Sequence, residues 1–155
     1  MKIRGDFAAM KVSDVCLIVV TLEVDAKKLL FLLLSEDGSV NRQGSGTLGN
    51  KNPDLFIGVT DPAIFKAVRS HLTEAMLERL LGQTFEHENP RGAPCKLDVR
   101  FQFRDGTSGG FIFLYGAQSQ GPPSYVADLV RAAVRQTDSW YEDFERIARQ
   151  GDKKP

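Results

Sequence analysis

The stretch VCLIVVTLEVDAKKLLFLLLSEDGS, residues 15–39, consists of two apolar runs separated by short polar segments. Val15–Val24 is rich in β-branched residues, apolar throughout its first half and alternating in its second, and it predicts a strand. Leu29–Leu34 is apolar throughout and too short for a free-standing helix, so it predicts a second, buried strand. The pair Asp37-Gly38 is typical of a tight hairpin turn, because glycine tolerates a positive φ. Strands joined by such short turns are antiparallel neighbours, so this stretch favours an antiparallel sheet.

Further strands are expected on either side of these two runs. Val40–Gln43 predicts a short third strand, and Leu55–Thr60 is apolar enough for another. Leu97–Arg104 alternates strictly between apolar and polar residues, which is typical of an antiparallel strand with one solvated face. Phe111–Tyr115 is expected to return beside it, whereas the polar segment Gln83–Pro94 predicts a loop.

A central helix is predicted to begin at Asp61-Pro62. Aspartate is a favoured N-cap, and proline loses nothing at the first helical position, where its missing N–H would have no partner. Apolar residues then recur every three or four positions as far as Leu80, and Gly82 is expected to end the helix as a left-handed cap.

The C-terminal region is predicted to be helical, as one bent helix or as two helices. An apolar stripe covers residues 126–134, and the pattern restarts at residues 137–139. There Ser139 and Glu142 fit a capping box, in which each side chain satisfies a free backbone N–H at the start of a helix. The last helical turns are expected to bury Trp140, Phe144 and Ile147.

These elements predict an α+β fold: a mainly antiparallel sheet of about five strands, with one central helix and one or two C-terminal helices packed on it. Residues 1–150 are expected to form a single domain and residues 151–155 a frayed tail. A chain of 155 residues can bury roughly 68–70% of its unfolded surface, so it needs no disulfide or metal to fold.

Composition excludes several classes of partner. The 20 Lys and Arg residues balance 20 Asp and Glu residues, whereas proteins built to bind nucleic acid or an anionic membrane need a surplus of positive charge. Neither apolar run approaches the ~20 residues that span a bilayer, and Asp6 and Asp14 argue against a signal peptide. Cys16 and Cys95 are expected to be reduced thiols, so a cytoplasmic protein is predicted.

No motif predicts a catalytic site or a bound cofactor. Gly44, Gly46 and Gly49 match the dinucleotide-binding fingerprint, but Pro53 follows where a helix would have to begin, so a loop is expected. No Gly-x-Ser-x-Gly elbow is present. The lack of such motifs favours a non-enzymatic protein over an enzyme.

Metal binding is a weaker alternative. His71 precedes Glu74 by three residues and Glu78 by seven, so these side chains could share one helix face, and His87 could complete a ligand set. A solvated helix surface accounts for the same pattern, and no metal site is predicted.

A first candidate binding site is the loop of residues 116–124, which runs from a strand end into a helix N-terminus. Backbone N–H groups at such a junction could receive an anion or a ligand, with Gly116, Gly121 and Ser124 as the candidate residues. A proline-stiffened connection between two elements is the alternative.

A second candidate is the group of aromatic residues Trp140, Tyr141 and Phe144. Trp140 and Phe144 fit the apolar stripe of the last helix, whereas Tyr141 is expected to point elsewhere. Large aromatic side chains on two sides of a terminal helix are common at protein interfaces. Core packing alone is the alternative.

The order of elements resembles that of the small chaperones that accompany secreted bacterial effectors, although those chaperones are usually acidic. This likeness of element order implies a protein partner and transfers no residue. The predicted function is therefore a non-enzymatic protein–protein interaction module, such as an adaptor, a chaperone or an inhibitor or immunity-type protein, with a protein partner or a homodimer. The alternative is a small-molecule-binding or enzymatic domain with a pocket near loops 44–50 and 116–124.

Overall fold

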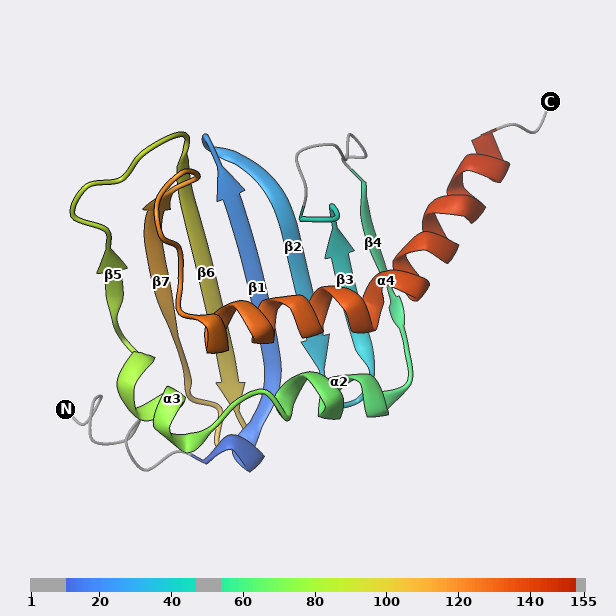
Figure 1. Ribbon diagram of the computed structural model, residues 1–155. Helices are drawn as coiled ribbons and strands as arrows, with labels where there is room; N and C mark the ends of the chain where they lie inside the picture. Colours follow the sequence, from blue (N-terminus) through green and yellow to red (C-terminus); the bar gives the residue numbers. More distant parts are fainter. Residues whose placement is uncertain (1–10, 47–53, 153–155) are drawn as a thin grey trace.

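The computed structural model describes residues 11–46 and 54–152, which build a seven-stranded sheet with helices on one of its faces (Figure 1). In chain order the elements are η1 (Val12–Asp14), β1 (Val15–Val24), β2 (Lys27–Ser35), β3 (Ser39–Gln43), β4 (Leu55–Val59), α2 (Pro62–Arg69), α3 (Glu74–Leu80), β5 (Thr84–Glu86), β6 (Pro94–Phe103), β7 (Ser108–Gly116) and α4 (Ser124–Asp152). The predicted α+β class with a mainly antiparallel sheet is confirmed, but the sheet has seven strands rather than about five.

The strands lie in the order β4-β3-β2-β1-β6-β7-β5, and every neighbouring pair is antiparallel except β5 and β7. The first four strands pair in sequence order as an antiparallel meander; short turns join β1 to β2 and β2 to β3, and residues 44–54 separate β3 from β4. β1 lies at the centre, where Val20 is opposite Leu32 of β2 and Val99 of β6. The turn between β1 and β2 is made by Asp25 and Ala26, both with positive φ, as the type I′ turns of two-residue hairpin loops require.

One face of the sheet carries the core. Inward-pointing residues of the long strands are almost fully buried there, beneath α4, which runs across the strands, and α2, which lies beside it (Figure 1). The strands contribute Val15, Ile18, Val20, Leu30, Leu32, Leu34, Val40, Leu97, Val99, Phe101, Phe103, Phe111 and Phe113 to this core. α4 contributes Val126, Leu129 and Ala133, one side chain per turn.

Two short helices stand where one central helix was expected. Asp61 caps α2 as predicted, its side chain accepting a hydrogen bond from the backbone N–H of Ala63 at 2.9 Å. α2 ends at Arg69, and α3 begins after Thr73, whose hydroxyl accepts from Met76 N–H at 3.1 Å. The apolar spacing continues through the break, which is why periodicity alone did not separate the two helices. Gly82 has the positive φ expected of it.

β5 lies inside the segment Gln83–Pro94 that was expected to be a loop. It pairs in parallel with Ile112–Leu114 of β7 and forms one edge of the sheet. All three of its residues are exposed, so it lacks the alternation by which a half-buried strand is recognised.

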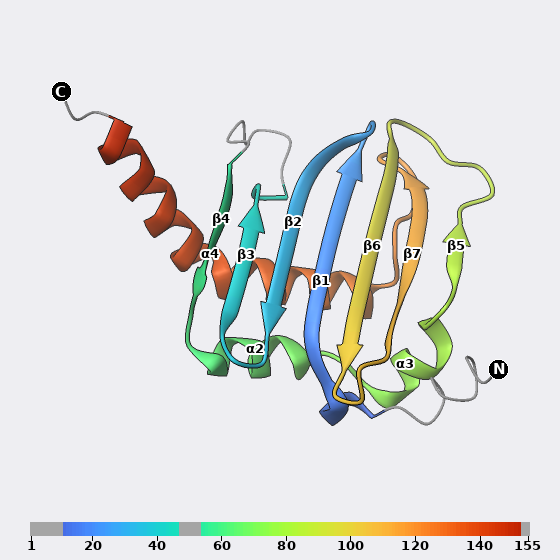
Figure 2. The same ribbon diagram turned by 180° about the vertical axis from the view of Figure 1, so that it is seen from behind.

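α4 is one continuous helix, so the alternative of two helices and the capping box at Ser139 were wrong. The Thr137 hydroxyl donates to the carbonyl of Ala133, one turn back, at 2.8 Å, an arrangement compatible with an unbroken helix. The C-terminal part of α4 projects beyond β4 in both views (Figures 1 and 2), and Ile147, expected to be buried, is 60% exposed there.

Two predicted features fall partly outside the described residues: positions 47–50 of the glycine-rich loop and positions 153–155 of the tail. Residues 151 and 152 belong to α4. Within the described ranges no helix is both long enough and apolar enough to cross a membrane.

Candidate interaction surface

The second face of the sheet is free of helices in the described part of the chain. Seen from behind, the strands lie in front and α2 and α4 behind them (Figure 2). Side chains that point to this open face are half-buried or exposed, whereas their neighbours in sequence are buried in the core.

The chemistry of the open face changes from strand to strand, and β7 presents Ile112 and Leu114 there beside the polar residues of β6. On β6 the open face presents the polar residues Lys96, Asp98, Arg100 and Gln102. On β1 and β2 it presents the apolar side chains that we call the open-face patch: Leu17, Val19, Leu29, Phe31 and Leu33. The two strands pair directly, with Val19 opposite Leu33, so the patch is continuous across them.

Polar side chains border the patch on both sides. Asn41 of β3 is opposite Leu33, and Gln43 is opposite Phe31. On the other side Arg100 of β6 is opposite Val19. Arg100 is ion-paired with Asp98 on the same strand at 3.1 Å. The patch is therefore a strip two strands wide between polar rows.

β4 is the outer strand at the other end of the sheet from β5, and we call its exposed side chains the β4 edge. These are Leu55, Ile57 and Val59, which are 46%, 65% and 70% exposed. Large apolar side chains so exposed on a sheet edge are unusual, because edge strands in soluble proteins are normally guarded by charge, proline or a bulge. The β4 edge is separated from the open-face patch by β3.

Aromatic residues hold β4 against α4 on the covered face. Phe56 lies 5.5 Å from the ring of Tyr141 and 5.9 Å from that of Phe144, measured between centroids, and Trp140 packs on Phe144 at 4.6 Å. A Cβ atom on Gly58 would come within 3.0 Å of the Trp140 ring. Glycine at this position thus lets the aromatic side chains approach the strand.

This packing also locates the three predicted interface residues. Tyr141 is buried at 3% exposure, although it was expected to point away from the core, and Trp140 and Phe144 are half-buried. A single α-helical face accounts for this, because Tyr141 continues the buried series of Ala133 and Thr137 at intervals of four residues.

A buried arginine fixes α4 over β3. Arg42 points into the covered face and is 1% exposed. Its guanidinium donates to the carbonyls of Gly44 and Val134, both at 3.1 Å, and to the Thr137 hydroxyl at 2.9 Å, and it pairs with Asp138 at 2.9 Å. The side chain therefore joins β3 to two turns of α4. Arg42 was not among the predicted site residues, although it shares its face of β3 with the inward-pointing Val40.

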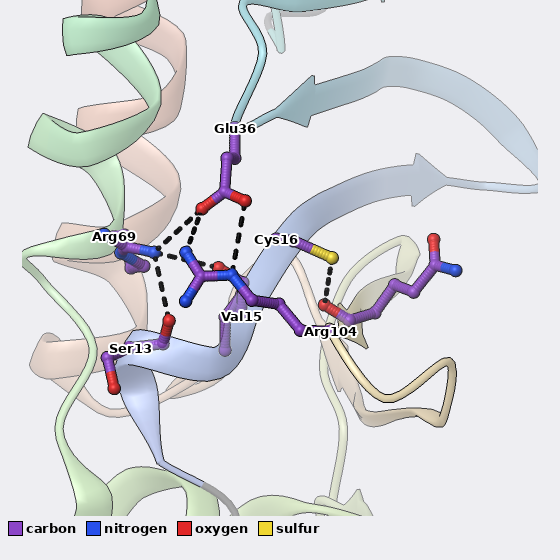
Figure 3. Close-up of polar contacts among 7 residues, drawn as sticks. Ser13, Val15, Cys16, Glu36, Arg69 and Arg104 are labelled. Atoms are coloured by element: carbon purple, nitrogen blue, oxygen red, sulfur yellow. Dashed lines mark hydrogen bonds and ion pairs between the residues drawn. The ribbon is translucent and has the colours of Figure 1, made fainter.

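A second polar cluster ties the ends of three elements together (Figure 3). Glu36, after β2, lies between Arg104, after β6, and Arg69, at the end of α2. Arg69 also donates to the carbonyl of Val15 at 3.1 Å. The hydrogen bond from Arg104 holds the pKa of Glu36 below its ordinary value of 4.5. The carboxylate of Glu36 thus pairs with both guanidinium groups, and the cluster stabilises the positions of the three elements relative to one another.

An open hollow of about 610 Å³ lies beside this cluster, lined in part by Lys11, Lys66 and Glu74. Glu74 accepts a hydrogen bond from the backbone N–H of Val12 at 2.5 Å, and so attaches the segment before β1 to α3. The contacts around this hollow thus connect elements of the fold.

The loop of residues 116–124 is packed against the segment before β6. The N–H groups of Ala117 and Gln118 donate to the carbonyls of Ala93 and Arg91, each at 2.9 Å. A Cβ on Gly116 would lie 2.1 Å from the Arg91 carbonyl oxygen, so glycine there permits the close approach of two backbones. These amides are therefore engaged within the chain.

The other residues of this loop lie nearer to solvent. Gly121 is exposed beside the ring of Tyr115, and it lines a hollow of about 160 Å³ with Phe85 and His87. Ser124 is the exposed first residue of α4, and the Pro123 carbonyl accepts the first helical N–H groups.

The glycine-rich loop lies beside a different hollow. Ser45 and Gly46 border a space of about 500 Å³ with α4 residues that include Arg131 and Arg135. The described residues of the two loops therefore line separate hollows, whereas the alternative function placed one pocket near both loops.

The histidines lie at the surface or in turns. His71 is exposed, and the Nδ1 atom of His87 accepts a hydrogen bond from Asn89 N–H at 3.0 Å. Within residues 11–46 and 54–152 no three or more His, Cys, Asp or Glu side chains form a group that could hold a metal ion.

Comparison of this chain with protein-family models, with curated proteins and with solved structures finds no match.

Proposed function

We propose that this protein is a non-enzymatic protein–protein interaction module of the cytoplasm, acting as an adaptor, a chaperone or an inhibitor, and that it binds its partner through the open-face patch. The observation that carries the proposal is the apolar character of β1 and β2 on both of their faces. Strands of this kind normally belong to sheets that are covered on both sides.

β6 provides an internal comparison within the same sheet. Its open-face residues are polar, as expected for a strand that faces water, whereas β1 beside it presents Leu17 and Val19. The other apolar side chains of this face, Ile112 and Leu114 of β7 and those of the β4 edge, are separated from the patch by polar residues of β6 and β3. Apolar surface gathered between polar borders is typical of interaction sites.

The dimensions of the patch favour an amphipathic helix as the partner element. Neighbouring strands lie roughly 4.8 Å apart, so a strip two strands wide matches the ~10 Å diameter of one helix. The apolar stripe of such a helix would cover Phe31 and Leu33, and its flanks would meet Asn41 on one side and Arg100 on the other. α4 covers the opposite face of the same strands in this manner.

In this proposal Trp140, Tyr141 and Phe144 act by holding β4 and the end of α4 in place. The alternative, a small-molecule-binding or enzymatic domain, is favoured by the hollow beside Ser45 and Gly46. The open-face patch carries the stronger inference because it is a continuous, partly exposed apolar surface, and a partner that covers it would gain the free energy of burying it.

Site-specific photo-crosslinking in the cells that encode the protein tests the proposal. Leu33→p-benzoylphenylalanine places the reactive group in the patch, and the same group at Arg131, on the solvent side of α4, is the matched control. We expect one discrete adduct with another protein from position 33 and none from position 131. Absence of an adduct at 33, equal labelling at both positions, or an adduct of this chain with itself at 33 would overturn the proposal.

A further inference from the structure

We propose that the β4 edge is where a second copy of this chain joins the sheet, strand against strand, about a two-fold axis through Ile57. The proposal builds on the interaction function above by naming the occupant of the exposed edge.

The two edges of the sheet differ in how they are guarded. β5 has three residues and carries the charged Glu86, so it is a poor template for another strand. β4 has five residues, LFIGV, with no charged residue and no proline. An edge of this composition can pair with an added strand. In a two-fold dimer the β4 edges of the two copies pair with each other, so neither is left for further strand addition.

The backbone of β4 presents its hydrogen-bonding groups outward beside the same residues. The Thr60 N–H donates to the Gly38 carbonyl at 2.8 Å, so Thr60 faces β3. Bonded and non-bonded pairs alternate along an antiparallel ladder, and the register places Gly58 and Phe56 in the bonded positions. The N–H and C=O groups of the β4 edge residues therefore point away from the sheet.

The sequence of β4 is complementary to itself in an antiparallel arrangement. With Ile57 on the axis, Leu55 of one copy is opposite Val59 of the other, so apolar side chains meet on the open face. On the covered face Phe56 is opposite Gly58, and a large side chain faces a position that has none. Every outward N–H on either copy then finds a carbonyl, and no like charges are opposed.

α4 extends over the same edge. Its C-terminal part passes beyond β4 in both views (Figures 1 and 2), and Ile147 is exposed on it. Stable interfaces bury roughly 800 Å² per partner, for which a five-residue strand is short. The projecting helix supplies further surface beside any strand that joins β4.

Light scattering during size-exclusion chromatography tests the proposal with charge substitutions on the axis. We expect the wild-type chain at ~100 μM to have twice the 17.2 kDa of one copy. Ile57→Lys and Ile57→Glu each place like charges opposite each other and should weaken self-association by about 100-fold or more. Mixed in equal amounts, the two variants should form a dimer again, because the axis then pairs opposite charges.

Two controls separate this edge from other surfaces. Thr84→Lys makes a similar change on β5 and should leave the dimer intact, and so should Leu33→Lys in the open-face patch. A monomeric wild-type chain, a dimer that survives Ile57→Lys, a mixture that stays monomeric, or a dimer lost with Leu33→Lys would each overturn the proposal. Crosslinking from position 33 depends on none of these results, so the two proposals can fail separately.

Discussion

Asp138→Ala should destabilise the protein more than Arg42→Met does, although Arg42 is the more deeply buried member of the pair. Arg42 is 1% exposed, whereas the Asp138 side chain is 44% exposed. Removing Asp138 leaves a buried cation without its counter-ion, and Thr137 and two carbonyls remain as its neutral partners. Removing the guanidinium leaves a carboxylate that water can solvate; the Val134 carbonyl still accepts from the Thr137 hydroxyl, and the Gly44 carbonyl loses this donor.

The magnitudes follow from this difference in exposure. Deleting one partner of a buried ion pair costs about 3–5 kcal/mol. Because water reaches Asp138, we expect about 3 kcal/mol for Asp138→Ala, at the lower end of that range. For Arg42→Met we expect about 1–2 kcal/mol, since methionine keeps contact with the Tyr141 ring, which lies 4.3 Å below the guanidinium.

Urea denaturation followed by circular dichroism at neutral pH measures both values as differences in the free energy of unfolding. The double variant with Arg42→Met and Asp138→Ala should lower the free energy of unfolding by no more than Arg42→Met alone. Without the Arg42 cation, no buried charge needs Asp138 as its counter-ion. Asp128→Ala is the matched control on the same helix: its pair with Arg131 is exposed on both sides, and its loss should cost under ~0.5 kcal/mol. If Arg42→Met costs as much as Asp138→Ala or more, the account of the buried cation is wrong.

Two further predictions concern β4 and the Glu36 cluster. Gly58→Ala should cost about 1–3 kcal/mol in the same assay, because the new methyl group meets the Trp140 and Phe144 rings at 3.0 and 3.1 Å, and an unchanged unfolding midpoint would contradict the packing described. Glu36 has a lowered pKa because it accepts hydrogen bonds from Arg104, so its contribution to stability is present above its ordinary value of 4.5 and is lost as the pH falls through the lowered one. The difference in unfolding free energy between wild type and Glu36→Gln should therefore shrink in acid, and a difference that grows in acid would refute it.

The sheet could be predicted from the sequence where local signals agree with tertiary packing. Val15–Val24 is a strand with the predicted bounds, and the strict alternation of residues 97–104 placed β6 with its polar side outward. β5 was not predicted, because a strand of three exposed residues shows no alternation of apolar and polar positions. The strand forms through its pairing with β7. Its position depends on a long-range contact that no local pattern encodes.

The candidate surfaces were harder to predict because they depend on what covers each face. Leu29–Leu34 was expected to be buried, and its apolar run gives no hint that Leu29, Phe31 and Leu33 lie on an open face. Residues alternate between the two faces of β3, so the position of Arg42 two residues after Val40 places it on the covered face. A lone arginine in a short strand is more often solvated, and it was therefore not expected there. Gly116 was predicted as part of an anion- or ligand-binding loop, whereas in the structure its lack of a Cβ permits the close approach of Arg91, which is far away in sequence.

The two proposed contacts can coexist on one molecule because β3 separates them. On the open face Ser39, Asn41 and Gln43 lie between the β4 edge and the open-face patch, so neither apolar surface extends into the other. A strand that joins β4 is added on the side away from β2, and it leaves Phe31 and Leu33 uncovered. Pairing through β4 would therefore extend the sheet and place two open-face patches on it, related by the same axis. A partner with two suitable helices would then bind the dimer more tightly than a single helix binds one patch. Once the first helix is bound, the second contact forms within the same complex.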